Sequence, residues 1–117
     1  MNYVDGFVAA VPTANREAYR KHAEKNAGLF REFGALAVVE CWGDDVPDGK
    51  LTSFPMAVKR NADETVVFSW VVWPSREARD EAWKKVMADP RMGPENNTMP
   101  FDGKRVIYGG FQILVEA

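Results

Sequence analysis

The sequence predicts an α+β fold in which two long helices pack against one antiparallel sheet of four strands. Two segments with helical spacing of apolar residues separate strand-like segments, in the order strand, helix, strand, strand, helix, strand. This β-α-β-β-α-β order is that of the ferredoxin-like fold. A chain of 117 residues can bury one ordinary core, so residues 1–117 are expected to form a single domain.

The first strand is predicted at residues 3–11 and the first helix at 16–33. The strand segment is rich in β-branched and aromatic residues, and the helix segment repeats its apolar residues at helical spacing. Thr13 or Asn15 is expected to cap the helix by accepting a backbone N–H bond. Gly34 suits the positive φ that commonly ends a helix.

Two further strands are predicted at residues 35–42 and 65–73, the second with the clearest pattern, TVVFSWVVW. Residues 43–50, GDDVPDGK, have the composition of a loop. Residues 52–60 fit two structures, a short helix capped by Thr52 or an extended segment. The sequence leaves this choice open.

Ser75 is expected to cap the second long helix, which ends near Ala88 before an Asp-Pro pair. Residues 91–100 predict an irregular loop, and residues 104–115 predict the last strand. That strand contains Gly109-Gly110, although glycine is a poor strand residue. Because adjacent strand residues point to opposite faces, the pair removes one side chain from each face, unless it marks a bulge.

The predicted strands are apolar on both faces, whereas a sheet with one wet face alternates apolar and polar residues. Helices cover only one face, and the sequence does not say which. A second copy of the sheet, packed through a twofold axis, is the simplest cover for the other face. The chain is therefore expected to form a homodimer of the dimeric α/β-barrel type. The alternative is a monomer whose loops cover the second face.

Charge and composition narrow the classes of partner. The net charge is −2, and Lys and Arg are dispersed among acids, so no nucleic-acid partner is expected. No apolar run approaches the ~20 residues of a membrane span, and the N-terminal segment does not have the pattern of a signal peptide. A cytoplasmic protein without membrane contact is expected. One Cys and one His are too few for the usual zinc sites, and no cofactor motif occurs, so neither metal nor cofactor is expected.

Three stretches together, VECWGDDVPDGK, ETVVFSWVVWPS and MPFDGKRVIYGGF, resemble the YbaA-like family, a bacterial domain of unknown function. The resemblance covers nearly the whole chain. It implies membership of the dimeric α/β-barrel superfamily, with that fold and a homodimer. It brings no reaction and no catalytic residues. The superfamily includes cofactor-free monooxygenases, small isomerases, haem proteins and ligand-sensing domains, so the fold alone implies no chemistry.

A pocket between helices and sheet is expected from the side of each helix or strand on which polar and aromatic residues lie. Its predicted lining is Tyr19, His22, Trp42, Trp70, Phe101, Arg105 and Tyr108. Tryptophan and tyrosine line ligand pockets because each joins an apolar body to one donor, although core or interface packing is the alternative for each of them.

Three residues are the catalytic candidates. His22 titrates near operating pH and can act as a general acid or base, or it is a hydrogen-bonded histidine at the edge of the core. Glu40 lies in an apolar strand and needs a partner, for which Arg105 or Lys59 is expected. Arg105 can hold a ligand carboxylate, or it forms a structural salt bridge to Asp102 or Glu40.

The function expected from this pattern is binding of a small apolar or aromatic molecule. The first alternative is a cofactor-independent enzyme of the monooxygenase or isomerase kind, in which His22 moves a proton. The second is a structural or interaction protein without a pocket. Both pocket functions require a cavity of at least ~300 Å3, and the enzyme also requires that His22 face it.

Overall fold

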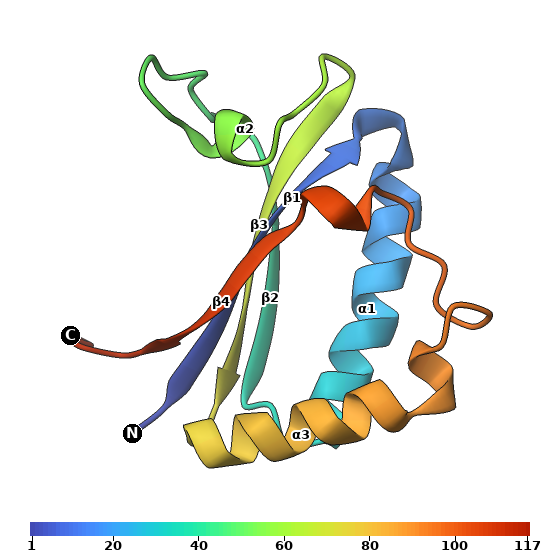
Figure 1. Ribbon diagram of the computed structural model, residues 1–117, viewed down its shortest axis with the longest axis vertical. Helices are drawn as coiled ribbons and strands as arrows, with labels where there is room; N and C mark the ends of the chain where they lie inside the picture. The colour runs from blue at the N-terminus through green and yellow to red at the C-terminus, as the bar shows by residue number, and fades with distance from the viewer.

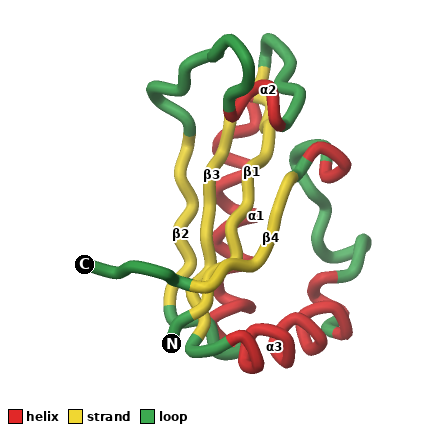
Figure 2. Tube along the Cα trace, turned by 60° about the vertical axis from the view of Figure 1, so that its left-hand side comes forward, coloured by secondary structure: helices red, strands yellow, loops and turns green.

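The chain, seen in a computed structural model that describes residues 1–117, is an α+β fold with one antiparallel sheet of four strands. The strand order is β2-β3-β1-β4, and every neighbouring pair is antiparallel (Figures 1 and 2). The fold class and the four-stranded antiparallel sheet are thereby confirmed. The elements are β1 (Tyr3–Pro12), α1 (Arg16–Glu32), β2 (Ala37–Trp42), α2 (Phe54–Ala57), β3 (Glu64–Trp73), α3 (Arg76–Ala88) and β4 (Ile107–Gln112), with 3-10 turns at Thr13–Asn15, Pro90–Met92 and Gly103–Arg105.

Helix ends follow local chemistry with one exception. The Ser75 hydroxyl accepts the Ala78 N–H at 3.0 Å, and Gly34 has a φ of +111°, as predicted. Neither predicted cap of α1 acts as one. The side chains of Thr13 and Asn15 bind elsewhere, to the Thr65 hydroxyl and the Pro100 carbonyl. A 3-10 turn leads into α1 instead.

The open choice at residues 52–60 is settled in favour of a short helix, α2. Ser53, not the predicted Thr52, caps it, since its hydroxyl accepts the Met56 N–H at 3.1 Å. A proline early in the helix is compatible with its first turn.

The last strand is shorter than the predicted 104–115. The Asp102 carboxylate accepts the Lys104 N–H at 3.0 Å and holds the start of that segment in a 3-10 turn. At the other end, Gln112 pairs with Tyr3, where β1 begins. This is the last pair of the β1–β4 ladder, and β4 ends with it.

Both long helices lie on the same side of the sheet (Figures 1 and 2). Helix α1 buries Tyr19 and Ala23 against Val11 and Val67 of the strands. Trp73, also on that face, is fully buried. The face of β3 that carries the alternate residues Val67 to Trp73 therefore meets the helices. No helix combines the length and the apolar character that crossing a membrane requires.

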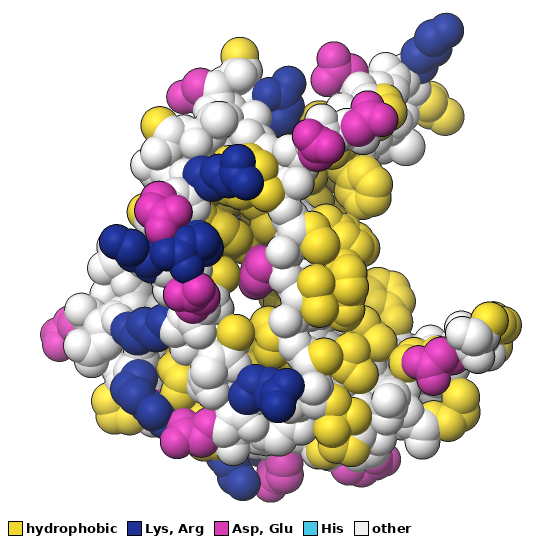
Figure 3. Space-filling model, turned by 180° about the vertical axis from the view of Figure 1, so that it is seen from behind, with side chains coloured by type: hydrophobic (Ala, Val, Ile, Leu, Met, Phe, Trp, Pro, Cys, Tyr) yellow, Lys and Arg dark blue, Asp and Glu magenta, His cyan; other side chains and the backbone are white.

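The opposite face of the sheet is covered only at one end. There Val58, just after α2, packs against Val8, Ala10 and Val66. The rest of this face is apolar and open: Phe68 is 43% exposed, Ile107 43% and Phe111 59%. Figure 3 shows hydrophobic side chains gathered along it, between the α2 loop and the C-terminal arm. The loops of the chain therefore leave most of this face uncovered.

Candidate functional site

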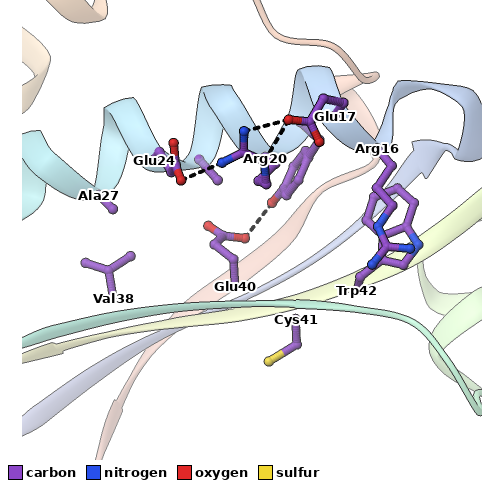
Figure 4. Close-up of a pocket in the computed structure, with 11 residues that line it drawn as sticks. Arg16, Glu17, Arg20, Glu24, Ala27, Val38, Glu40, Cys41 and Trp42 are labelled. Carbon is purple, nitrogen blue, oxygen red and sulfur yellow. Dashed lines mark hydrogen bonds and ion pairs between the residues drawn. The ribbon is translucent and has the colours of Figure 1, made fainter.

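A cavity of about 340 Å3 lies between α1 and β2, on the helix side of the sheet (Figure 4). Its wall is largely apolar, formed by Ala23, Ala27, Val38 and Trp42 with the ring of Tyr19. Its rim on α1 is charged, with Arg16, Glu17, Arg20 and Glu24. Glu40 rises from β2 between wall and rim and is the only carboxylate that the sheet contributes.

The local sequence explains this shape. Tyr19, Ala23 and Ala27 are four residues apart, so they form one stripe of α1 that faces the sheet. The two alanines are small and leave space above Val38. Side chains alternate along β2, so Glu40 shares its face with Val38. The Cys41 thiol points to the other face, and this residue borders the cavity through its backbone.

Tyr19 and Glu40 form the polar centre of the cavity. The Tyr19 hydroxyl donates a hydrogen bond to Glu40 Oε1 at 2.6 Å. Although the Glu40 side chain opens to solvent through the cavity, the surrounding protein desolvates it enough to raise its pKa, an effect that hydrogen bonds from Tyr19 and Ser69 partly oppose. Burial and the Glu40 charge raise the pKa of Tyr19, which stays a donor. Glu40 retains unused acceptor capacity, because a carboxylate can accept about four hydrogen bonds.

The cations nearest this cavity are already engaged. Arg20 donates to Glu17 at 2.5 Å and to Glu24 at 2.6 Å. The Arg16 guanidinium lies over the Trp42 ring, 5.5 Å from its centre. Neither residue pairs with Glu40. Tyr19 takes the place of the Arg105 or Lys59 partner predicted for it, and that part of the prediction was wrong.

His22 lies next to Tyr19, with 6.4 Å between the ring centres, but it does not line the cavity. Its half-buried ring packs edge-on against Phe101 at 5.9 Å between ring centres, and its Nε2 is 3.0 Å from Asn26 Nδ2. Burial, with a smaller effect of Lys25, lowers the pKa of His22. These contacts are those of a hydrogen-bonded histidine at the edge of the core.

Arg105 belongs to a separate ion-pair cluster at the start of β4. Its guanidinium donates to both Glu64 oxygens at 2.7 and 2.6 Å and to Asp102 at 3.0 Å. Glu64 is 7% exposed, and the hydrogen bonds from Arg105 lower its pKa. The structural pairing with Asp102 is present, and the guanidinium is fully occupied away from the cavity. It ties the turn before β4 to the first residue of β3.

The remaining predicted pocket residues are distributed over three places. Phe101 packs on Tyr19 at 5.5 Å, as does Trp42 at 6.3 Å, but only Trp42 reaches the cavity. Trp70 lies on the opposite face, beside Phe68 at 5.6 Å. Tyr108 is on the helix side but borders a different groove. Of the predicted lining, the structure brings Tyr19 and Trp42 together with Glu40.

Two sets of residues at or near the cavities were not predicted from the sequence. The charges of the α1 rim have the i,i+3 and i,i+4 spacing of an ordinary solvated helix face, which gives no signal of a cavity. Asp5 did carry a signal, because it is an acid within an apolar strand, as Glu40 is. It is 3% exposed and accepts hydrogen bonds from Trp73, Trp83 and Arg79.

No group of three or more His, Cys, Asp or Glu side chains is placed to hold a metal ion.

The raised pKa of Glu40 predicts a pH-dependent stability difference from its glutamine variant. A carboxyl with a raised pKa stabilises the fold fully below its unfolded value of about 4.3, and this contribution is lost as pH rises through the folded pKa. Wild type should therefore lose stability relative to Glu40→Gln between about pH 4 and neutrality. Urea unfolding of both proteins across that range measures the difference. Glu95→Gln, in an exposed loop, should show no such trend, and a flat difference for Glu40→Gln would contradict the assignment.

Comparisons with known proteins identify relatives but no activity. The family described as "Protein of unknown function (DUF1428)" matches residues 2–103. "Uncharacterized protein YbaA" of Escherichia coli (strain K12) is 60% identical over 116 residues, 99% of each chain, and the protein of the same description from Shigella flexneri matches equally well. A solved structure of Rv0793 from Mycobacterium tuberculosis aligns with a TM-score of 0.49 at 18% identity, over 100% of this chain and 99% of that one. A likeness at that level carries no further conclusion.

Proposed function

Since the chain belongs to the DUF1428 family, whose description gives no activity, we propose a function from its own cavity: it binds a small, largely apolar or aromatic molecule that donates a hydrogen bond to Glu40. The observation that carries the proposal is the Glu40 carboxylate, which is partly desolvated and only partly hydrogen-bonded inside a mostly apolar cavity. The volume of about 340 Å3 is at the lower end of ligand pockets.

The charges around the cavity favour a neutral donor, such as a hydroxyl group. Arg16 forms no ion pair and lies at the wall over Trp42, where it disfavours a bound cation. Glu40 disfavours a bound anion. The Tyr19 hydroxyl already donates its hydrogen bond to Glu40, so the ligand has to supply the second hydrogen-bond donor. A phenol of one ring fits these conditions.

Replacing Glu40 by glutamine tests the proposal with 4-ethylphenol as the probe. Glutamine keeps the shape and one acceptor oxygen but removes the charge, and a hydrogen bond to a charged group is stronger by about 1 kcal/mol. Titration calorimetry at neutral pH should show binding weakened by about fivefold or more in Glu40→Gln. Glu95→Gln should bind as wild type does. Unchanged affinity in Glu40→Gln would remove Glu40 from the ligand site.

A second candidate is a cofactor-independent enzyme of the isomerase kind. A glutamate of raised pKa beside a tyrosine hydroxyl is suited to accept and return a proton. In that case Glu40, not the predicted His22, is the proton carrier, because His22 does not line the cavity. An enzyme of this kind would exchange a carbon-bound proton of its ligand with deuterium from solvent, and a binding protein would not.

We also propose that two copies pack their open sheet faces together, so that ferredoxin-like protomers form a dimeric α/β barrel. The exposed Phe68, Ile107 and Phe111 support this, since a monomer rarely leaves so large an apolar face in water. Sedimentation equilibrium at micromolar concentration should give twice the chain mass of 13.1 kDa. A monomer at that concentration would contradict the proposal. The cavity lies on the helix side and stays accessible in such a dimer.

A further inference from the structure

A second hollow, a groove of about 670 Å3, lies on the helix side between α3 and the β1–β4 edge. Figure 2 shows α3 crossing the end of the sheet on the side of β4. The groove shares no residue with the cavity at Glu40. The side chains that shape it are Phe7, Trp83, Met87 and Tyr108, with Arg79 and Lys84 among its charged residues.

One wall of the groove is aromatic. The Phe7 ring centre lies 6.4 Å from that of Trp83 and 6.5 Å from that of Tyr108, and its plane is inclined by 49° to Trp83 and by 29° to Tyr108. Tyr108 is 79% exposed, and its hydroxyl forms no hydrogen bond within the protein. A large aromatic surface is therefore available to a ligand ring, which aromatic side chains bind by stacking.

This wall is fixed from behind by Asp5. The buried Asp5 carboxylate accepts the Trp83 indole N–H at 2.9 Å and the Arg79 Nη2–H at 2.8 Å. A buried ion pair adds little stability over well-packed apolar residues, so stability alone does not account for it. Its geometric effect is to hold the Trp83 ring and the Arg79 guanidinium in one orientation. Binding sites require such preorganised walls.

The most weakly paired cation at the groove is Lys84. Asp5 and Asp80 share the Arg79 guanidinium, and Asp80 also lies 3.7 Å from Arg76. Lys84, in contrast, has only Glu81 nearby, at 3.9 Å, and its side chain is 78% exposed. Its ammonium can therefore meet an acidic group on a ligand whose ring lies on the aromatic wall.

We propose that this groove is a second binding site, which takes a flat aromatic molecule with one acidic group. The ring packs on the wall that Phe7, Trp83 and Tyr108 form, and the acidic group pairs with Lys84. The site does not depend on the function proposed for the cavity at Glu40. It lies on the helix side, so packing of two open sheet faces leaves it accessible.

Titration of 15N-labelled protein with 2-naphthoate tests the site, with indole N–H signals assigned from Trp→Phe variants. The Trp83 signal should shift and saturate. Tyr108→Ala should weaken binding by about fivefold, since an aromatic contact of this kind contributes ~1 kcal/mol. Lys84→Gln should weaken it by about threefold, as loss of an exposed ion pair does. Lys85→Gln, the neighbouring exposed lysine of α3 outside the groove, should bind as wild type does.

Three results would overturn the proposal. The first is a Trp83 signal that does not move at millimolar 2-naphthoate. The second is equal binding of 2-naphthylmethylamine, which has the opposite charge. The third is a shift confined to the Trp42 signal, because Trp42 lines the other cavity. That third result would place the ligand beside Glu40, so failure of this site is distinguishable from failure of the first.

Discussion

Replacing Asp5 by alanine is expected to lower the free energy of unfolding by roughly 3–5 kcal/mol, the range for breaking a buried ion pair. Asp5 is 3% exposed and accepts hydrogen bonds from three side chains. Its removal leaves the indole N–H groups of the fully buried Trp73 and of Trp83 without an acceptor, and it leaves Arg79 with Asp80 alone. Unpaired buried donors of this kind are among the most destabilising defects that a single substitution produces.

Urea unfolding at neutral pH measures this loss. Asp5→Asn keeps an acceptor oxygen and nearly the same shape, so it should be destabilised less than Asp5→Ala. Asp45→Ala, in an exposed loop, is the matched control and should lie within about 0.5 kcal/mol of wild type. If Asp5→Ala unfolds within about 1 kcal/mol of wild type, the hydrogen bonds assigned to Asp5 do not hold the fold together.

Valine at Gly110 is expected to destabilise the fold by about 3 kcal/mol, toward the upper end of overpacking effects. Gly110 pairs with Asp5 across the β1–β4 ladder and faces the helices. A Cβ placed there would collide with the Tyr3 hydroxyl and lie 2.7 Å from Arg79 Nη2. The substitution therefore has to displace the guanidinium that pairs with Asp5.

The neighbouring Gly109 supplies the matched comparison. A Cβ there meets the Phe111 ring at 3.5 Å, an ordinary contact, and it points to the open face of the sheet. In the dimer proposed above, Gly109→Val should therefore weaken the pairing of the two sheets and change stability only in a concentration-dependent way. The loss in Gly110→Val should be independent of protein concentration. Equal effects of the two substitutions would contradict the assignment of these faces.

Most of the fold was predictable because it follows from local periodicity. The long helices and β3 carry clear patterns, and Ser75 and Gly34 mark helix ends by their own chemistry. The limits of β4 were not predictable. The start depends on a local turn held by Asp102, for which the segment gave no clear pattern, and the end depends on where the distant β1 begins at Tyr3.

The candidate site was predictable only in part, because it depends on which face of the sheet the helices cover. Tyr19, Glu40 and Trp42 were singled out from their position and do border one cavity. Trp70 is a tryptophan in an apolar strand, as Trp42 is, yet it lies on the face that the helices do not cover. Both faces of β3 are apolar, so periodicity alone gives no reason to prefer one. Asp5 was missed although the reasoning used for Glu40, a carboxylate that needs a partner in an apolar strand, applies to it equally.

The central claim, that Glu40 accepts a hydrogen bond from a ligand inside the α1–β2 cavity, is tested most directly by comparing two probes that differ only by a methyl group on the phenolic oxygen. Wild-type protein is titrated with 4-ethylphenol and with 4-ethylanisole, its methyl ether, at one neutral pH. The two differ in the ability to donate a hydrogen bond, and a bond to a charged acceptor contributes ~1.5–3 kcal/mol. The phenol should therefore bind at least tenfold more tightly. Equal affinity, or tighter binding of the ether, would contradict the claim.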